Sequence, residues 1–161
     1  MKNLLSVLTI LILTSTSVFS AGSSGDSEPK VSDYKKAVKL INSAKKYESD
    51  GKNEKAERKY KQAQKLLLKS NAKKPNNADT LNYLGFTTRK LGDYENGEKF
   101  YLKGLEIEPN HVGINEYLGE LYVVTNRIDL ANERLKVLKN CNCEEYNELK
   151  EIINGNKKSK Y

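Results

Sequence analysis

The chain is poor in the residues on which most catalytic and metal sites depend. Its 161 residues include one histidine, His111, and two cysteines, Cys141 and Cys143. A Ser/His/Asp or Cys/His set would have to draw on that single histidine, and two cysteines are too few to hold a metal ion. No glycine-rich phosphate loop occurs, and the carboxylates are dispersed along charged stretches. We therefore expect no enzyme activity, no cofactor and no metal site.

Arginine is also scarce, although the formal net charge is +7. Arginine forks onto phosphate groups, whereas lysine acts as a point charge. Most of the positive charge here is lysine, and the lysines alternate with glutamates in segments such as 53–60, which is typical of a solvated helical face. The arginines are Arg58, Arg89, Arg127 and Arg134. We expect no nucleic-acid partner, while a weak attraction to acidic envelope surfaces stays open.

The apolar run 4–13 is too short to cross a membrane, since a transmembrane helix needs about 20 apolar residues. Lys2 precedes the run and mostly small, polar residues follow it, with Val18 and Ser20 at the −3 and −1 positions of a cleavage site. This layout is typical of a secretory signal peptide. We expect a signal peptide at 1–20, with an uncleaved anchor as the alternative, and a flexible Gly/Ser linker at 21–30. The predicted location is the periplasm of a Gram-negative bacterium.

The remainder of the chain contains a repeat. The dipeptides Leu84-Gly85 and Leu118-Gly119 lie 34 positions apart, and two of the three prolines have the same spacing. Apolar residues around each dipeptide recur at helical intervals. A period of this length is typical of a helix–turn–helix unit that buries its apolar face only by stacking on a neighbour.

These residues resemble the tetratricopeptide repeat (TPR) family, whose unit has Leu-Gly at positions 7 and 8, a glycine in its turn and a proline near its end. The unit 78–111 has the Leu-Gly dipeptide, Gly92 in the turn and Pro109 at the end. The unit 112–143 has the same dipeptide, but Cys143 stands where the proline belongs.

The first and last parts of the folded region depart from the regular repeat. In the first unit, 31–77, Pro75 comes seven residues late, which is about two helical turns, so we expect an extended second helix. The segment 144–155 has the spacing of one more helix, which would cap the exposed apolar face of the last repeat. The resemblance thus implies an all-α, TPR-like α-solenoid of about three repeats plus a C-terminal capping helix.

The resemblance also implies a partner-binding groove, because ligands of this family lie against the first helix of each repeat. The corresponding residues here are Asn82, Phe86, Arg89, Lys90, Glu116, Glu120 and Val123. Phe86 is unusual on a face that should be mostly polar. It either anchors a partner side chain or packs against a neighbouring helix.

A clamp for terminal carboxylates, which some members of the family carry, is absent. Glu116 and Glu120 occupy clamp positions in the third unit, where they would repel a carboxylate. The resemblance therefore implies a non-catalytic scaffold or adaptor in the cell envelope, binding a protein or peptide whose identity the sequence leaves open. Association with cell wall or membrane surface through a lysine-rich face, and thiol–disulfide chemistry, are the alternatives.

The pair Cys141 and Cys143 lies where the third unit meets the capping helix. Cysteines of an exported chain are expected to oxidise. On an extended stretch their Cα atoms would be roughly 7 Å apart, at the edge of disulfide geometry. A structural disulfide is the favoured interpretation; free or intermolecular thiols, a redox-active pair and, least favoured, metal binding are the alternatives.

Overall fold

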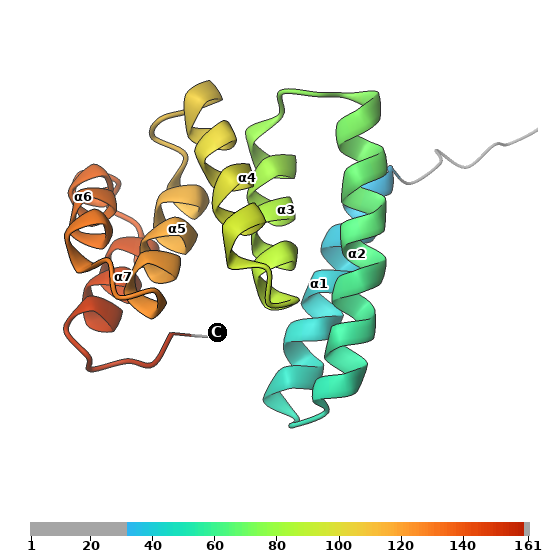
Figure 1. Cartoon of the computed structure of the whole chain (residues 1–161), viewed down its shortest axis with the longest axis horizontal. Coiled ribbons are helices and arrows are strands. Elements are labelled where there is room, and N and C mark those ends of the chain that lie inside the picture. Colours follow the sequence, from blue (N-terminus) through green and yellow to red (C-terminus); the bar gives the residue numbers. More distant parts are fainter. Residues whose placement is uncertain (1–31, 160–161) are drawn as a thin grey trace, which may run out of the picture. The chain divides into compact units, whose positions relative to one another are not determined.

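The computed structural model describes residues 32–159, and within this range the chain forms seven helices and no strand (Figure 1). The fold class is therefore all-α, as the sequence predicts. The predicted signal peptide and linker lie outside the described residues. The helices are α1 (Asp33–Ser49), α2 (Asn53–Lys73), α3 (Ala78–Lys90), α4 (Tyr94–Ile107), α5 (Val112–Val124), α6 (Ile128–Leu138) and α7 (Glu144–Ile153).

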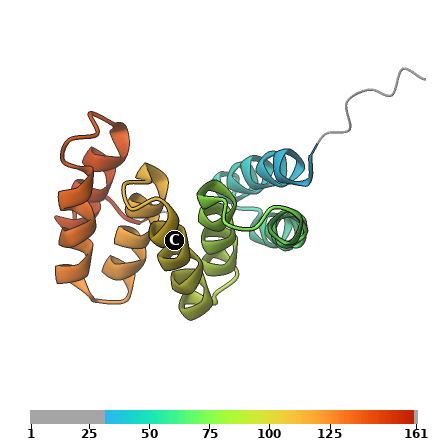
Figure 2. The ribbon, with the colours of Figure 1, turned by 90° about the horizontal axis from the view of Figure 1, so that it is seen from above.

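Consecutive helices pack as three hairpins, α1 with α2, α3 with α4, and α5 with α6. Each hairpin contacts the next through α2 and α3, or through α4 and α5. The first helices of the hairpins also contact one another, α1 with α3 and α3 with α5, and Figure 2 shows the hairpins side by side in this order. Helix α7 packs on α5 and α6 and covers the last hairpin. This is the stacking that a 34-residue repeat predicts.

Side-chain caps and left-handed turn residues set the helix boundaries. Asn77 and Asp93 precede α3 and α4, and their side-chain oxygens accept hydrogen bonds from backbone N–H groups of the first turn at 2.8 and 3.1 Å. Between α3 and α4, Gly92 has φ +90°, a conformation that glycine adopts without the penalty of a Cβ. Asn126 takes the equivalent place between α5 and α6, with φ +58°.

Helix α2 has the predicted extension. It contains 21 residues against 14 in α4, so it is longer by about two turns. In the added turns Leu67 is buried, whereas the neighbouring Leu68 is 49% exposed, because the extension packs on one side only. Lys73 near its end forms a 2.7 Å ion pair with Asp33 at the start of α1.

The Leu-Gly dipeptides are explained by close helix packing. A Cβ at Gly85 would lie 2.5 Å from a ring carbon of Tyr101, so the glycine lets α4 approach α3. A Cβ at Gly119 would lie 2.5 Å from a methyl carbon of Leu149, so the second glycine admits α7. Leu149 and Ile152 are buried, and α7 therefore covers apolar surface as a capping helix should.

Candidate protein-binding face

The residues predicted to line the groove lie on two first helices that contact each other. Helix α3 carries Asn82, Phe86, Arg89 and Lys90, and α5 carries Glu116, Glu120 and Val123. Lys90 and Val123 are half-buried, and the others are buried. Most of the predicted groove residues thus belong to the packing between helices.

Phe86 is the centre of an aromatic contact that joins four helices. Its ring lies 5.8 Å from that of Tyr60 on α2 and 5.1 Å from that of Tyr117 on α5. Lys45 of α1 places its ammonium group 4.7 Å from the Phe86 ring centroid and donates a 3.3 Å hydrogen bond to the Tyr117 hydroxyl. Phe86 is 2% exposed, so these contacts agree with the packing interpretation of this residue rather than with an accessible anchor.

Arg89 and Glu120 form a buried ionic contact between α3 and α5. Both side chains are 0% exposed, and Arg89 Nη2 lies 3.6 Å from Glu120 Oε2. Arg89 Nη1 also donates a 2.6 Å hydrogen bond to the backbone oxygen of Tyr117. Buried charges of this kind tolerate the loss of one partner poorly. The two residues therefore hold the first helices together.

A second polar contact joins α3 to the first hairpin. Lys90 forms an ion pair with Glu48 of α1, and the Tyr60 hydroxyl donates a 2.8 Å hydrogen bond to the same carboxylate. Burial raises the pKa of Tyr60 far above its usual value, and the hydrogen bond to Glu48 adds to the shift. Burial likewise raises the pKa of Tyr117. Both hydroxyls therefore stay protonated: that of Tyr60 donates to Glu48, and that of Tyr117 accepts from Lys45.

The open part of the face is acidic and lies between α5 and α7. A pocket of about 200 Å³ occurs there. Its lining residues are Glu116, Tyr117, Glu144, Glu145 and Glu148. Of these residues, the sequence predicts only Glu116 as a partner contact, because the TPR resemblance does not assign contact positions to a capping helix. The glutamates in the first turn of α7 were visible in the sequence, but their ordinary interpretation is a favourable interaction with the helix dipole.

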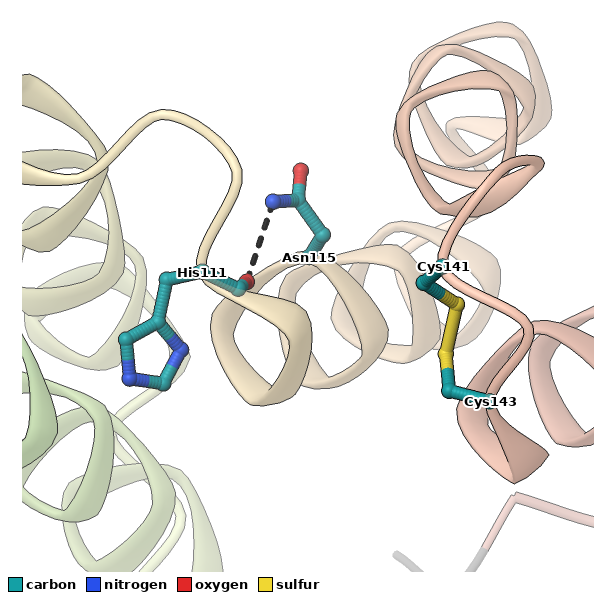
Figure 3. The surroundings of a disulfide bond; sticks show 4 residues. All are labelled: His111, Asn115, Cys141 and Cys143. Atoms are coloured by element: carbon teal, nitrogen blue, oxygen red, sulfur yellow. Dashed lines mark hydrogen bonds between the residues drawn. A yellow bond between two sulfur atoms is a disulfide. The ribbon is translucent and has the colours of Figure 1, made fainter.

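The two cysteines are joined by a disulfide in the loop between α6 and α7 (Figure 3). Their Cα atoms are 5.2 Å apart, well within disulfide geometry. The extended conformation assumed from the sequence is wrong, because Asn142 has φ +49° and bends the loop. The bond lies immediately before α7, whose N-cap residue is Cys143.

His111 has a structural role at the start of α5. Its Nδ1 accepts a 3.1 Å hydrogen bond from the backbone N–H of Ile114, and its backbone oxygen accepts one from the Asn115 amide (Figure 3). Between residues 32 and 159, no group of three or more His, Cys, Asp or Glu side chains is placed to share a metal ion. In the same range, no helix has both the length and the apolar character that a membrane span requires.

No protein-family model and no curated protein matches this sequence. Solved structures do share its fold. The first TPR domain of Spaghetti (RPAP3), solved with the HSP90 peptide SRMEEVD, has a TM-score of 0.54 and 20% identity, covering 77% of this chain and 95% of that one. The Yersinia enterocolitica type III secretion translocator chaperone SycD has a TM-score of 0.54 and 14% identity, covering 73% and 81%. At such identities the likeness establishes the fold, a TPR-like helical repeat.

Proposed function

We propose that this chain is a non-catalytic protein-interaction scaffold that binds a segment of a partner protein along the face formed by α3, α5 and α7. The observation that carries the proposal is the stacking of hairpins with their first helices on one face, next to the acidic pocket between α5 and α7. In the RPAP3 domain, a fold of this kind holds a peptide of HSP90, and SycD is itself a chaperone.

The residues of this face then divide into two groups. Phe86, Arg89 and Glu120 build the face, since their side chains are used in contacts between helices. A partner would contact the residues that solvent reaches, foremost Glu144 and Glu145 beside the pocket. The partner-binding function therefore concentrates at the α5–α7 end of the face.

Crosslinking in living cells tests this proposal. A photoreactive amino acid would replace Glu145, and the matched control would replace Glu106, an exposed glutamate on α4. We expect a defined protein adduct from position 145, reduced by the second substitution Glu148→Lys, and no such adduct from position 106. Equal adducts from both positions, or none from position 145, would refute the proposal.

We further propose that the scaffold acts in the cell envelope after export to the periplasm. The apolar run 4–13 followed by small, polar residues supports export, and the disulfide suits an oxidising compartment. Residues 1–30 fused to alkaline phosphatase should yield active, exported enzyme, whereas the same fusion with Leu8→Arg should stay inactive in the cytoplasm. Retention of the unaltered fusion in the cytoplasm would contradict export.

A further inference from the structure

The segment after α7, residues 155–159, turns back toward α5; we call it the return segment (Figure 1). Gly155 has φ +77° and its backbone N–H bonds to the carbonyl of Ile152, which reverses the chain at the end of the helix. The backbone N–H of Asn156 donates to the carbonyl of Glu151 at 3.0 Å, and its side-chain amide donates to the Glu151 carboxylate at 3.0 Å. The direction of the segment is thus set by local hydrogen bonds.

The return segment contacts the acidic end of the binding face at two places. Lys157 forms a 2.8 Å ion pair with Glu148, which lines the acidic pocket. The Ser159 hydroxyl donates a 2.9 Å hydrogen bond to Oε2 of Glu120, the same oxygen that lies 3.6 Å from Arg89. Ser159 is half-buried although its neighbour Lys158 is exposed. A lysine-rich piece of the chain is therefore seated against glutamates of α5 and α7.

The charge of this site selects what can replace the segment. Four of the five residues that line the pocket are glutamates, in a chain whose net charge is +7. Clustered carboxylates attract cationic groups and repel anionic ones. The lysine of the return segment already satisfies one of these glutamates, and a lysine or arginine from another protein could make the same contact.

We propose that the return segment is an intramolecular ligand of the α5–α7 acidic site, and that a partner segment bearing lysine or arginine binds there by displacing it. The second half of this inference rests on the proposed scaffold function. When a site is closed in some of the molecules, its apparent dissociation constant equals the intrinsic one divided by the fraction of molecules in which the site is open. If the segment closes the site in about nine molecules of ten, opening it fully would tighten binding about tenfold.

The probe is a fluorescent peptide with the sequence of residues 155–161, Gly-Asn-Lys-Lys-Ser-Lys-Tyr, added to the full chain. Its affinity would be measured by fluorescence anisotropy for the native chain, for Lys157→Glu, for Ser159→Ala and for the double variant. Lys158→Glu is the matched control, since it makes the same change of charge at an exposed neighbouring residue. Circular dichroism would verify that each variant keeps its helices.

We expect each single variant to bind the peptide about threefold more tightly than the native chain, and the double variant about tenfold more tightly. The control should stay within about twofold, because it changes only the screened surface charge. Equal affinities for all proteins, an effect of Lys158→Glu equal to that of Lys157→Glu, or no binding to the double variant would each overturn the inference. This experiment and the crosslinking experiment can fail independently of each other. Crosslinking tests the proposed scaffold function and needs a cellular partner, whereas the peptide titration tests the return segment and needs none.

Discussion

Replacing Arg89 by methionine is expected to destabilise the fold, even though the family resemblance places this residue among the partner contacts. The substitution keeps much of the side-chain length and removes the charge. It removes the guanidinium group beside the Glu120 carboxylate, and the Glu120 side chain is 0% exposed. It also removes the 2.6 Å hydrogen bond to the backbone oxygen of Tyr117. Removing one member of a buried ion pair typically costs about 3–5 kcal/mol.

The magnitude is large against the stability of a small domain, which is typically about 5–15 kcal/mol. Arg58→Met is the matched control, since the Arg58 side chain is 63% exposed and its contact with Glu54 is 3.8 Å long. A surface pair of that kind contributes about 0–1 kcal/mol. The double variant Arg89→Met/Glu120→Met should lose less free energy of unfolding than the sum of the two single variants, because replacing both residues leaves no unpaired charge in the interior.

Urea unfolding followed by circular dichroism measures these free energies. We expect a lower midpoint for Arg89→Met, with an unchanged slope, and partial recovery in the double variant. A cost for Arg89→Met no greater than that for Arg58→Met would refute the reasoning that the pair is structural. Such a result would return Arg89 to the set of partner contacts.

Three further predictions concern packing, pH and the disulfide. Gly85→Ala should lower stability by about 1–2 kcal/mol in urea unfolding, because the clash with the Tyr101 ring outweighs the gain in helix propensity; an unchanged midpoint would contradict the close approach. Burial raises the pKa of Tyr34 to about 12, against an ordinary 10.0. The contribution of this protonated tyrosine to the free energy of unfolding is therefore complete below pH 10 and is lost as the pH rises toward 12. Absorbance titration should show tyrosine ionisation at a higher pH in the folded chain than in the chain unfolded by urea. Burial also raises the pKa of Tyr60, Tyr83, Tyr101, Tyr117 and Tyr122. Because Cys141 and Cys143 close a very short loop, replacing both by serine should cost no more than about 2 kcal/mol, and mass spectrometry of the unreduced protein should find no free thiol.

The helix pairs could be predicted because their boundaries have local chemical signals. Gly92 and Asp93 mark a left-handed turn followed by an N-cap, and the structure places them between α3 and α4. The late Pro75 predicted the long α2, since a delay of two turns preserves the facing of the helix. Such signals depend on neighbours in sequence, so spacing alone is enough to find them.

The exposure of the binding face could not be predicted in the same way. Phe86 is covered by Tyr60 and Tyr117, which are 26 and 31 residues away, and no local pattern records that contact. Ser159 reaches Glu120 across 39 positions because Gly155 reverses the chain after α7. The resemblance supplied positions within a repeat, whereas these contacts arise between repeats and outside them.

Amide hydrogen exchange of the native chain, with and without the partner captured by crosslinking, tests the central claim most directly. The account predicts that the partner slows exchange in α5 and α7, and in the facing part of α3, while α2, α4 and α6 keep their rates. Protection confined to the second helices of the hairpins would contradict a binding face on α3, α5 and α7.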